Sequence, residues 1–239
     1  KYLIHSESFW NSVKATTIFT VGTFIPLVIM SLILAVFISS RKRFQKFFQM
    51  AYYSPALLSS VVAATIWLLM FDPRGLANQF LNFILNTPGK DYKWLTNPSM
   101  LRSATILVYF WKYIGYFTVI FITGIASIPQ TINEAARIDG ANRWQVFTRI
   151  TLPLIKPTTL LVSIMAMTRC LKTFSTQYLF TQSGAPLKPI DVITLNIYNT
   201  AIRDHQIGKA SAMSIILFAI IMILTLIQFR VSKAEEVQY

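Results

Sequence analysis

The stretch Glu134–Pro157, which reads EAARIDGANRWQVFTRITLPLIKP, is polar and basic and lies between long apolar runs. Thr131 precedes Glu134 by three residues, the spacing of a capping box, in which a threonine oxygen and a glutamate each satisfy a backbone N–H at the start of a helix. Gly140 supplies the positive φ with which helices commonly end. The pattern therefore predicts a short helix that begins near Thr131 and ends near Gly140.

The second half of the stretch predicts another short helix. Asn142 is followed three residues later by Gln145, again the spacing of a capping box, and Pro153 predicts the end of this helix. The two halves together predict a helix–turn–helix at about residues 131–153. Small residues form its surface and allow another protein to approach closely: Ala135, Ala136, Gly140 and Ala141.

The composition of the chain indicates a membrane protein. Of its 239 residues, 54% are hydrophobic and 13% are charged, whereas soluble domains carry about 25% charged residues. A bilayer is crossed by about 20 apolar residues, and five such stretches are predicted: Ala15–Ser40, Ala51–Phe71, Ser103–Ile128, Thr158–Thr181 and Ala210–Phe229. Backbone groups within lipid must be satisfied inside their own segment, so the spans are helices. The predicted fold is an all-α, polytopic transmembrane helical bundle that forms a single domain over residues 1–239.

Several classes of function lack the residues that they need. Gly208-Lys209 is followed by alanine and has no glycine five residues earlier, so it is not a P-loop. His5 and His205 lie far apart without ligand spacing, so no metal site is predicted. No nucleophile is paired with a base, so no catalytic residue is predicted and the chain is not expected to be an enzyme. The 22 Lys and Arg residues are spread among loops rather than gathered on one face, so nucleic-acid binding is not predicted despite a net charge of +13.

The predicted spans contain no Asp or Glu. Transporters that are coupled to protons or sodium depend on ionisable groups within the membrane. Active transport by this chain would therefore require a separate motor.

The loop charges predict an orientation in the membrane. Arg41, Lys42, Arg43 and Lys46 place four cations and no acid in one short loop, which assigns this loop to the cytoplasm. Residues 72–102 and 187–209 then lie outside, while residues 134–156 and the C-terminus lie inside.

The first outer loop contains a further predicted helix. Leu76, Phe80, Phe83 and Ile84 recur at helical spacing, which predicts a helix along the outer membrane face. Its apolar side chains are either interfacial anchors or a docking surface for an extracellular binding protein.

At the helix–turn–helix the chain resembles a known family. The run is similar to the cytoplasmic EAA loop of ABC importer permeases at Glu134-Ala135-Ala136, Gly140-Ala141 and Ile150-Thr151-Leu152-Pro153. Asp139, Phe147 and Pro157 resemble the carbohydrate-uptake branch of that family. The likeness covers most of the chain and includes Phe9-Trp10-Asn11-Ser12, Phe71-Asp72-Pro73, Ser127-Ile128-Pro129 and Gly208-Lys209-Ala210-Ser211-Ala212.

The resemblance implies a type I ABC importer permease of the bacterial cytoplasmic (inner) membrane that works by alternating access. Two cytoplasmic ATPase subunits would hold ATP and Mg, so that this chain itself binds no cofactor. An extracellular binding protein would deliver a sugar or oligosaccharide, and a second, homologous permease would complete the pathway as a heterodimer. The coupling contact with the ATPases would fall on Glu134, Ala135, Ala136, Asp139, Gly140 and Ala141. Members of the family carry one more span ahead of the region at Phe9, so a sixth span is expected before Lys1.

Two other functions remain open. One is the permease of an ABC importer for a solute other than a sugar. The other is a passive channel or membrane scaffold that uses the loop only to bind a partner.

The fourth predicted span carries the charges that bear on the solute. Arg169 and Lys172 are three residues apart and share a helix face, and an isolated charge within lipid costs about 2.5–3.5 kcal/mol or more. Such residues usually face a bundle interior or a cavity. They fit an anionic sugar, because many members of the resembled family have an aspartate about where Ser175 stands here. They fit equally well a pairing with carboxylates on a partner permease. Polar residues continue the candidate pathway: Thr173, Thr176, Gln177 and Tyr178.

Trp111 and Lys112 are the remaining pathway candidates. An aromatic face next to a cation is suited to stacking against a sugar ring. Trp and Tyr also gather at membrane interfaces, and Lys112 could reach such an interface by extending its side chain.

Overall fold

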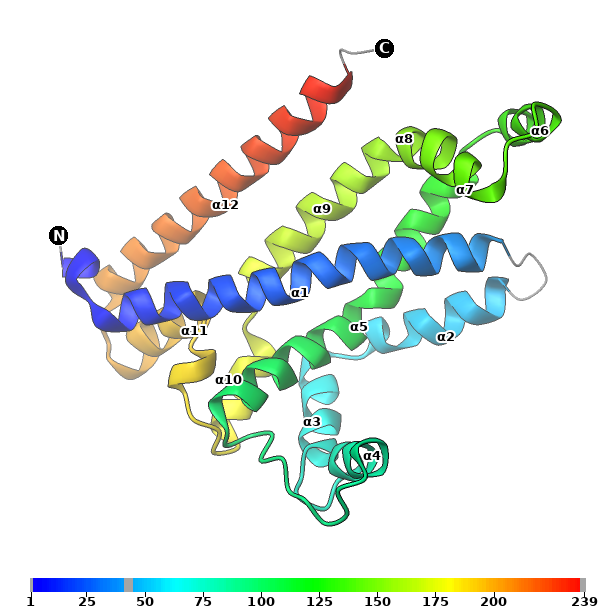
Figure 1. Ribbon diagram of the computed structural model, residues 1–239. Coiled ribbons are helices and arrows are strands. Elements are labelled where there is room, and N and C mark those ends of the chain that lie inside the picture. Colours follow the sequence, from blue (N-terminus) through cyan, green and yellow to red (C-terminus); the bar gives the residue numbers. More distant parts are fainter. Residues whose placement is uncertain (1, 41–44, 237–239) are drawn as a thin grey trace. The chain divides into compact units, whose positions relative to one another are not determined.

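The structure is a computed structural model that describes residues 2–40 and 45–236. Within these ranges it is helical and contains no strand (Figure 1), which confirms the predicted all-α fold. The α-helices are α1 (Glu7–Ser39), α2 (Gln45–Leu57), α3 (Ser60–Met70), α4 (Leu76–Leu85), α5 (Pro98–Ala126), α6 (Gln130–Ile138), α7 (Arg143–Val146), α8 (Leu152–Leu154), α9 (Lys156–Leu171), α10 (Ser175–Gln182), α11 (Ile193–Tyr198) and α12 (Ile207–Glu236). Short 3₁₀ turns form η1 (Tyr2–His5) and η3 (Lys188–Ile190), and π-helical turns form η2 (Phe147–Thr151) and η4 (Asn199–Arg203).

Three of the described helical segments are single helices that are long and apolar enough to cross a membrane: Glu7–Ser39, Pro98–Ala126 and Ile207–Ser232. Two further candidate spans are pairs of helices with a sharp bend between them, Phe47–Leu57 with Ser60–Met70 and Arg143–Leu154 with Lys156–Gln182. The number of spans reaches the predicted five when each bent pair counts as one. Arg41, Lys42 and Arg43, on which the predicted orientation depends, lie outside the described residues, and so does the side chain of Lys46.

The second span is not the continuous helix that its apolar run predicts. Helix α2 contains Pro55, whose missing N–H weakens the helix, and α2 ends at Leu57. Ser59 then begins α3 as an N-cap, since its hydroxyl accepts a hydrogen bond from the backbone N–H of Val62 at 3.2 Å. A proline and a capping serine thus break a stretch that carries no charge.

The fourth span is interrupted as well. Helix α9 ends at Leu171, and α10 begins only at Ser175, after an N-cap residue Phe174 with φ of −145° and ψ of −56°. The hydroxyl of Thr194 donates a hydrogen bond to the carbonyl oxygen of Thr173 within this break. The predicted continuous helix over Thr158–Thr181 is therefore two helices joined by a short non-helical link.

Pro153 does not end its helix where the sequence predicts. The helical path continues through the π-helical turn η2 and through α8, and it bends by 67° after Leu154. The backbone N–H of Leu152 donates to the carbonyl of Phe147, five residues earlier, which shifts the hydrogen-bond ladder just before the proline. The wider turn accommodates a residue that can donate no backbone hydrogen bond.

The chain forms two compact units. Among the described residues, the first consists of residues 2–23, 57–112 and 168–221, and the second of residues 24–40, 45–56, 113–167 and 222–236. The core of the first unit is aromatic: the ring of Phe71 stacks on Trp94 at 5.0 Å between centroids and meets the edge of Phe180 at 6.2 Å, while Trp67 lies 5.1 Å from Phe71. In the second unit, α5 passes so close to α2 that a Cβ added at Gly115 would lie 1.8 Å from the carbonyl oxygen of Tyr52.

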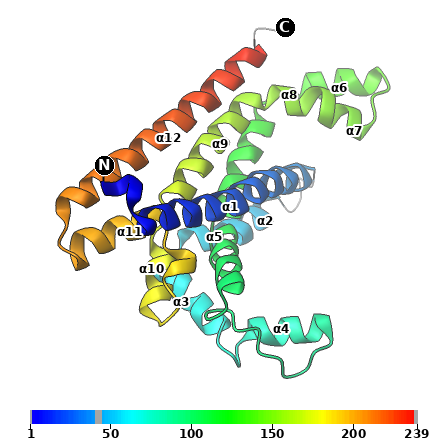
Figure 2. The same ribbon diagram turned by 60° about the vertical axis from the view of Figure 1, so that its left-hand side comes forward.

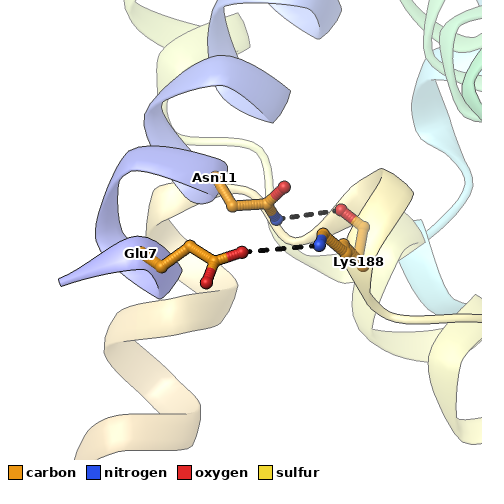
Figure 3. A network of polar contacts seen from close by, with 3 residues as sticks. All are labelled: Glu7, Asn11 and Lys188. Carbon is orange, nitrogen blue, oxygen red and sulfur yellow. Dashed lines mark hydrogen bonds and ion pairs between the residues drawn. The ribbon is translucent and has the colours of Figure 1, made fainter.

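In the first unit, polar contacts tie the start of α1 to the segment before α11. Figure 3 shows Asn11 and Glu7 directed at Lys188: Asn11 Nδ2 donates to the Lys188 carbonyl at 3.0 Å, and Lys188 Nζ lies 3.6 Å from Glu7 Oε1. Deeper in the unit, the backbone N–H of Ile193 donates to Thr16 Oγ1 at 2.9 Å. These contacts fix the loop between α10 and α11 against one end of α1.

Candidate functional site

The first half of the helix–turn–helix is built around Gly140. Helix α6 begins at Gln130 after Pro129, without a side-chain cap, so the predicted capping box at Thr131 is wrong because the helix starts earlier. At its end, the N–H of Ala141 donates to the carbonyl of Ala136 at 2.9 Å, and the N–H of Gly140 donates to that of Arg137 at 3.1 Å. This is a Schellman motif. Gly140 adopts a φ of +80°, which confirms the predicted positive φ.

The second half begins with the predicted capping box. Asn142 Oδ1 accepts a hydrogen bond from the N–H of Gln145 at 2.9 Å, and Gln145 Oε1 accepts one from the N–H of Asn142 at 2.8 Å. In Figure 2 the chain reverses direction between α6 and α7. A glycine in the left-handed region and a doubly satisfied cap thus fix a tight turn between the two short helices.

The turn presents most of the predicted small and acidic residues on its surface. Glu134, Ala135, Asp139 and Gly140 are exposed and Ala141 is half-buried, whereas Ala136 is buried. Two large apolar side chains lie exposed beside them, Ile138 at 86% and Trp144 at 70%. Sequence reasoning placed both on helices but did not assign them to the surface. The sequence feature that could have identified them is the presence of two large apolar side chains within a polar and basic stretch.

The cations of the candidate pathway lie at the break between α9 and α10. Arg169 is in the last turn of α9, Lys172 follows it in the link, and both are exposed. Thr173, Thr176 and Gln177 are buried. Thr173 Oγ1 donates to Gln177 Oε1 at 3.0 Å, so these two side chains stabilise the broken helix from within the first unit.

Tyr178 belongs to an aromatic group that the sequence did not reveal. Its ring stacks on Phe174 with centroids 5.2 Å apart and meets the edge of Tyr198 at 5.2 Å. Phe174 and Tyr198 are also in contact, at 5.3 Å. A hydrogen bond with Tyr178 raises the pKa of the Tyr198 hydroxyl. Tyr198 escapes sequence reasoning because it lies on α11, twenty residues away from Tyr178 along the chain.

Trp111 and Lys112 lie within the first unit. The half-buried ring of Trp111 meets the edge of Trp67 at 5.6 Å. Lys112 is only 6% exposed, and its Nζ donates a hydrogen bond to Ser60 Oγ at 2.8 Å. The lysine head group is therefore buried and bonded to the first turn of α3 rather than extended to a membrane surface.

Comparisons with known proteins agree on one family. Residues 14–236 match the model of the binding-protein-dependent transport system inner membrane component. The chain is 31% identical to the "probable starch degradation products transport system permease protein AmyD" of Thermoanaerobacterium thermosulfurigenes, over 96% of this chain and 77% of the relative. It is also 31% identical to the sn-glycerol-3-phosphate transport system permease protein UgpA of Agrobacterium fabrum, over 95% of this chain and 77% of the relative.

Solved structures of a bacterial ABC transporter that imports the acidic polysaccharide alginate share the fold. One superposes with a TM-score of 0.87 at 28% identity, covering 98% of this chain and 82% of the other chain. A second, in complex with an alginate pentasaccharide-bound periplasmic protein, gives a TM-score of 0.84 at 26% identity, covering 98% and 81%. With its apolar helices and the type I importer permease fold of these neighbours, the chain is a multi-pass membrane protein and a transporter component rather than an enzyme. It belongs to the binding-protein-dependent transport system inner membrane component family, the permease subunits of ABC importers.

Proposed function

We propose that this chain is one of two permeases of an importer that moves an acidic oligosaccharide across the bacterial cytoplasmic membrane. The observation that carries the proposal is the exposure of Arg169 and Lys172 at the break between α9 and α10. Cationic side chains of membrane-spanning segments usually face a bundle interior, a water-filled cavity or an opposite charge. A solute with carboxylates on a sugar backbone offers the opposite charge.

The aromatic group next to this break supports a sugar. Phe174, Tyr178 and Tyr198 lie together at the break that carries the two cations. Their ring faces are suited to stacking on a sugar, and the two tyrosine hydroxyls are suited to hydrogen bonds with it. Thr173, Thr176 and Gln177 are buried beside this aromatic group, and the hydrogen bond from Thr173 to Gln177 holds the break in place. Trp111 and Lys112 stay proposed members of the pathway, although their contacts in the structure are with Trp67 and Ser60. The alginate importer, whose transported polysaccharide is acidic, is a structural neighbour that points to the same class of solute.

A second candidate solute is an organic phosphate. A relative that is 31% identical belongs to an sn-glycerol-3-phosphate transport system, and a phosphate is bound by Arg and Lys as readily as a carboxylate. Pairing of the two cations with carboxylates of the second permease is the alternative that involves no solute.

The energy for transport would come from ATP and Mg held by two cytoplasmic ATPase subunits. The turn between α6 and α7 is the proposed contact with one of them, through Glu134, Ala135, Asp139, Gly140 and Ala141, with Ala136 packed beneath and the exposed Ile138 and Trp144 alongside. One chain carries one such turn, so a second, homologous permease would supply the other turn and the other half of the pathway. An external binding protein would deliver the solute, as a periplasmic protein accompanies the alginate transporter.

Charge reversal at Arg169 tests the solute. We expect Arg169→Glu to abolish uptake of a uronate oligosaccharide by the reconstituted transporter and to leave uptake of a neutral oligosaccharide nearly unchanged. Arg169→Lys should restore most of the acidic uptake, and Arg230→Glu, at an exposed arginine far along the chain, is the matched control. If the variant lost only the uptake of glycerol phosphate, an organic phosphate would be favoured as the solute over an acidic oligosaccharide. Equal uptake of all solutes by the variant and the wild type would refute a role for Arg169 in recognising the solute.

A further inference from the structure

Helix α4 exposes a stripe of large apolar side chains. Phe83 is 86% exposed, Phe80 65%, Leu76 62% and Ile84 57%, and their spacing of three and four residues places them on one face of the helix. The segment Leu76–Leu85 carries no charged residue. In water, such a face would be left without an apolar neighbour.

The opposite face of α4 is polar and is held by its own loop. The buried side chain of Asn78 donates through Nδ2 to the Pro73 carbonyl at 3.0 Å and to Asp91 Oδ1 at 3.1 Å. Its Oδ1 accepts from the Tyr92 N–H at 3.3 Å and from Trp94 Nε1 at 3.0 Å. The rotation of α4 about its axis is therefore fixed, so the apolar stripe cannot turn inward.

One turn further along, the same polar face is held again. Asn82 Nδ2 donates to the Lys90 carbonyl at 3.0 Å, and its Oδ1 accepts from Thr87 Oγ1 at 3.1 Å. Asn78 and Asn82 are four residues apart on this face.

Helix α4 follows directly on a helix that belongs to a candidate membrane span. Helix α3 belongs to a candidate span and ends at Met70, and Gly75 begins α4 so close by that a Cβ added there would lie 2.4 Å from the Met70 carbonyl oxygen. Figures 1 and 2 both show α4 running across the end of α3 rather than continuing it. A helix that turns aside at the end of a span in this way is suited to lie along the membrane–water interface.

The exposed apolar surface of α3 continues onto α4. Val62, Ile66 and Leu69 recur along one side of α3 and are 46%, 38% and 71% exposed, as expected of a face that meets lipid. Leu76 follows on the next helix, beyond the tight turn at Gly75. Lys90 and Lys93, on the loop that follows α4, and Arg74, just before it, are suited to the phosphates of lipid headgroups.

From this continuity, we propose that α4 is an interfacial helix whose occupant is the lipid bilayer. Leu76, Phe80, Phe83 and Ile84 insert among the lipids, about 5–10 Å into the boundary between headgroups and acyl chains. The hydrogen bonds of Asn78 keep this face directed at the membrane. The proposal concerns the lipid-facing side of the chain and is independent of the solute that is transported.

Fluorescence quenching tests the occupant directly. The full transporter, carrying Phe83→Cys with an environment-sensitive fluorophore, is reconstituted into vesicles of phosphatidylethanolamine and phosphatidylglycerol. The native Cys170 is buried, so the introduced thiol is the accessible one. Quenching is measured with iodide in the water and with lipids that carry a nitroxide on the acyl chain. Leu69→Cys on α3 is the positive control for lipid contact, and Pro88→Cys on the following loop is the control for water contact.

We expect the label at position 83 to be quenched by the nitroxide lipid as strongly as the label at position 69 and to be shielded from iodide relative to the label at position 88. Phe80→Cys should give the same result and guards against a local effect of one substitution. Quenching by iodide would show that the face meets water and would overturn the proposal. Shielding from both quenchers would show that a protein covers the face, which would overturn it equally.

Discussion

Gly115 shows how closely one residue controls the packing of helices in the second unit. A Cβ at this position would lie 1.8 Å from the carbonyl oxygen and 2.3 Å from the carbonyl carbon of Tyr52, so α2 and α5 would have to separate. We expect Gly115→Ala to lower the stability of the purified protein by about 1–3 kcal/mol, the usual effect of overpacking. Thermal unfolding in detergent measures this. Gly208→Ala is the control, since it lies in α12 with no atom within 4 Å of the added Cβ, and it should not lower stability.

Asp191 makes the stability of the first unit depend on pH. Its side chain is 5% exposed, and burial raises the pKa of the carboxyl group from 3.8 to about 6, although a hydrogen bond from Asn196 at 2.8 Å opposes the shift. The folded state therefore holds the proton more tightly than the unfolded state. Its contribution to stability is present at low pH and is lost as the pH rises from about 4 to about 6.

We expect Asp191→Asn to remove this loss. Between pH 4 and pH 7 the wild type should lose up to about 3 kcal/mol of stability relative to the variant. The measurement is thermal unfolding of both proteins across that range. Asp204→Asn, at an exposed carboxylate, is the matched control and should follow the wild type. Parallel curves for the wild type and Asp191→Asn would contradict the role assigned to this burial.

At the scale of helices, the sequence predicted the existence of the elements better than their continuity. Apolar runs predict spans because crossing lipid needs length and low charge, and all five runs are helical over most of their length. The breaks depend on details that hydropathy ignores, namely the hydroxyl of Ser59 at the start of α3 and the non-helical backbone of Phe174 before α10. The capping box at Asn142 was predictable because its two residues are close in sequence.

In the candidate site, too, features set by neighbouring residues were predictable, and features set by tertiary contacts were not. The turn at Gly140 is encoded locally, and so its positive φ follows from the sequence. The aromatic group of Phe174, Tyr178 and Tyr198 joins two helices that are separated along the chain, so no spacing rule points to it. The burial of Lys112 is likewise a tertiary property, because it depends on the approach of Ser60 from α3.

The turn between α6 and α7 supports a prediction about coupling. Gly140→Glu adds a charged side chain where φ is +80°, and we expect it to uncouple ATP hydrolysis from uptake, so that hydrolysis no longer depends on solute. Gly89→Glu is a close control, since Gly89 has a φ of +77° and, like Gly140, has no atom within 4 Å of an added Cβ. Both variants therefore carry similar backbone strain, and only the position at the turn should matter. Solute-stimulated uptake by Gly140→Glu at the wild-type level, with normal expression, would refute the proposed contact.

At the scale of the whole molecule, each of the two units exposes a surface of a kind that proteins or ligands bind. The turn between α6 and α7 exposes Ile138 and Trp144, and the break after α9 exposes Arg169 and Lys172. Large apolar side chains exposed at a loop are typical of a surface that binds another protein, and exposed cations are suited to an anionic partner or solute.

We therefore expect this chain to purify from its native membrane, in mild detergent, with one copy of a second, related permease and two copies of an ATPase. Native mass spectrometry gives the copy numbers, and Gly140→Glu should reduce the recovery of ATPase while retaining the second permease, because only the α6–α7 turn is altered. Gly89→Glu should recover both at the wild-type level. A chain that is recovered alone or only with copies of itself, in several detergents, would contradict the proposed assembly and would favour a passive channel or scaffold, whose solute flux should then proceed without ATP.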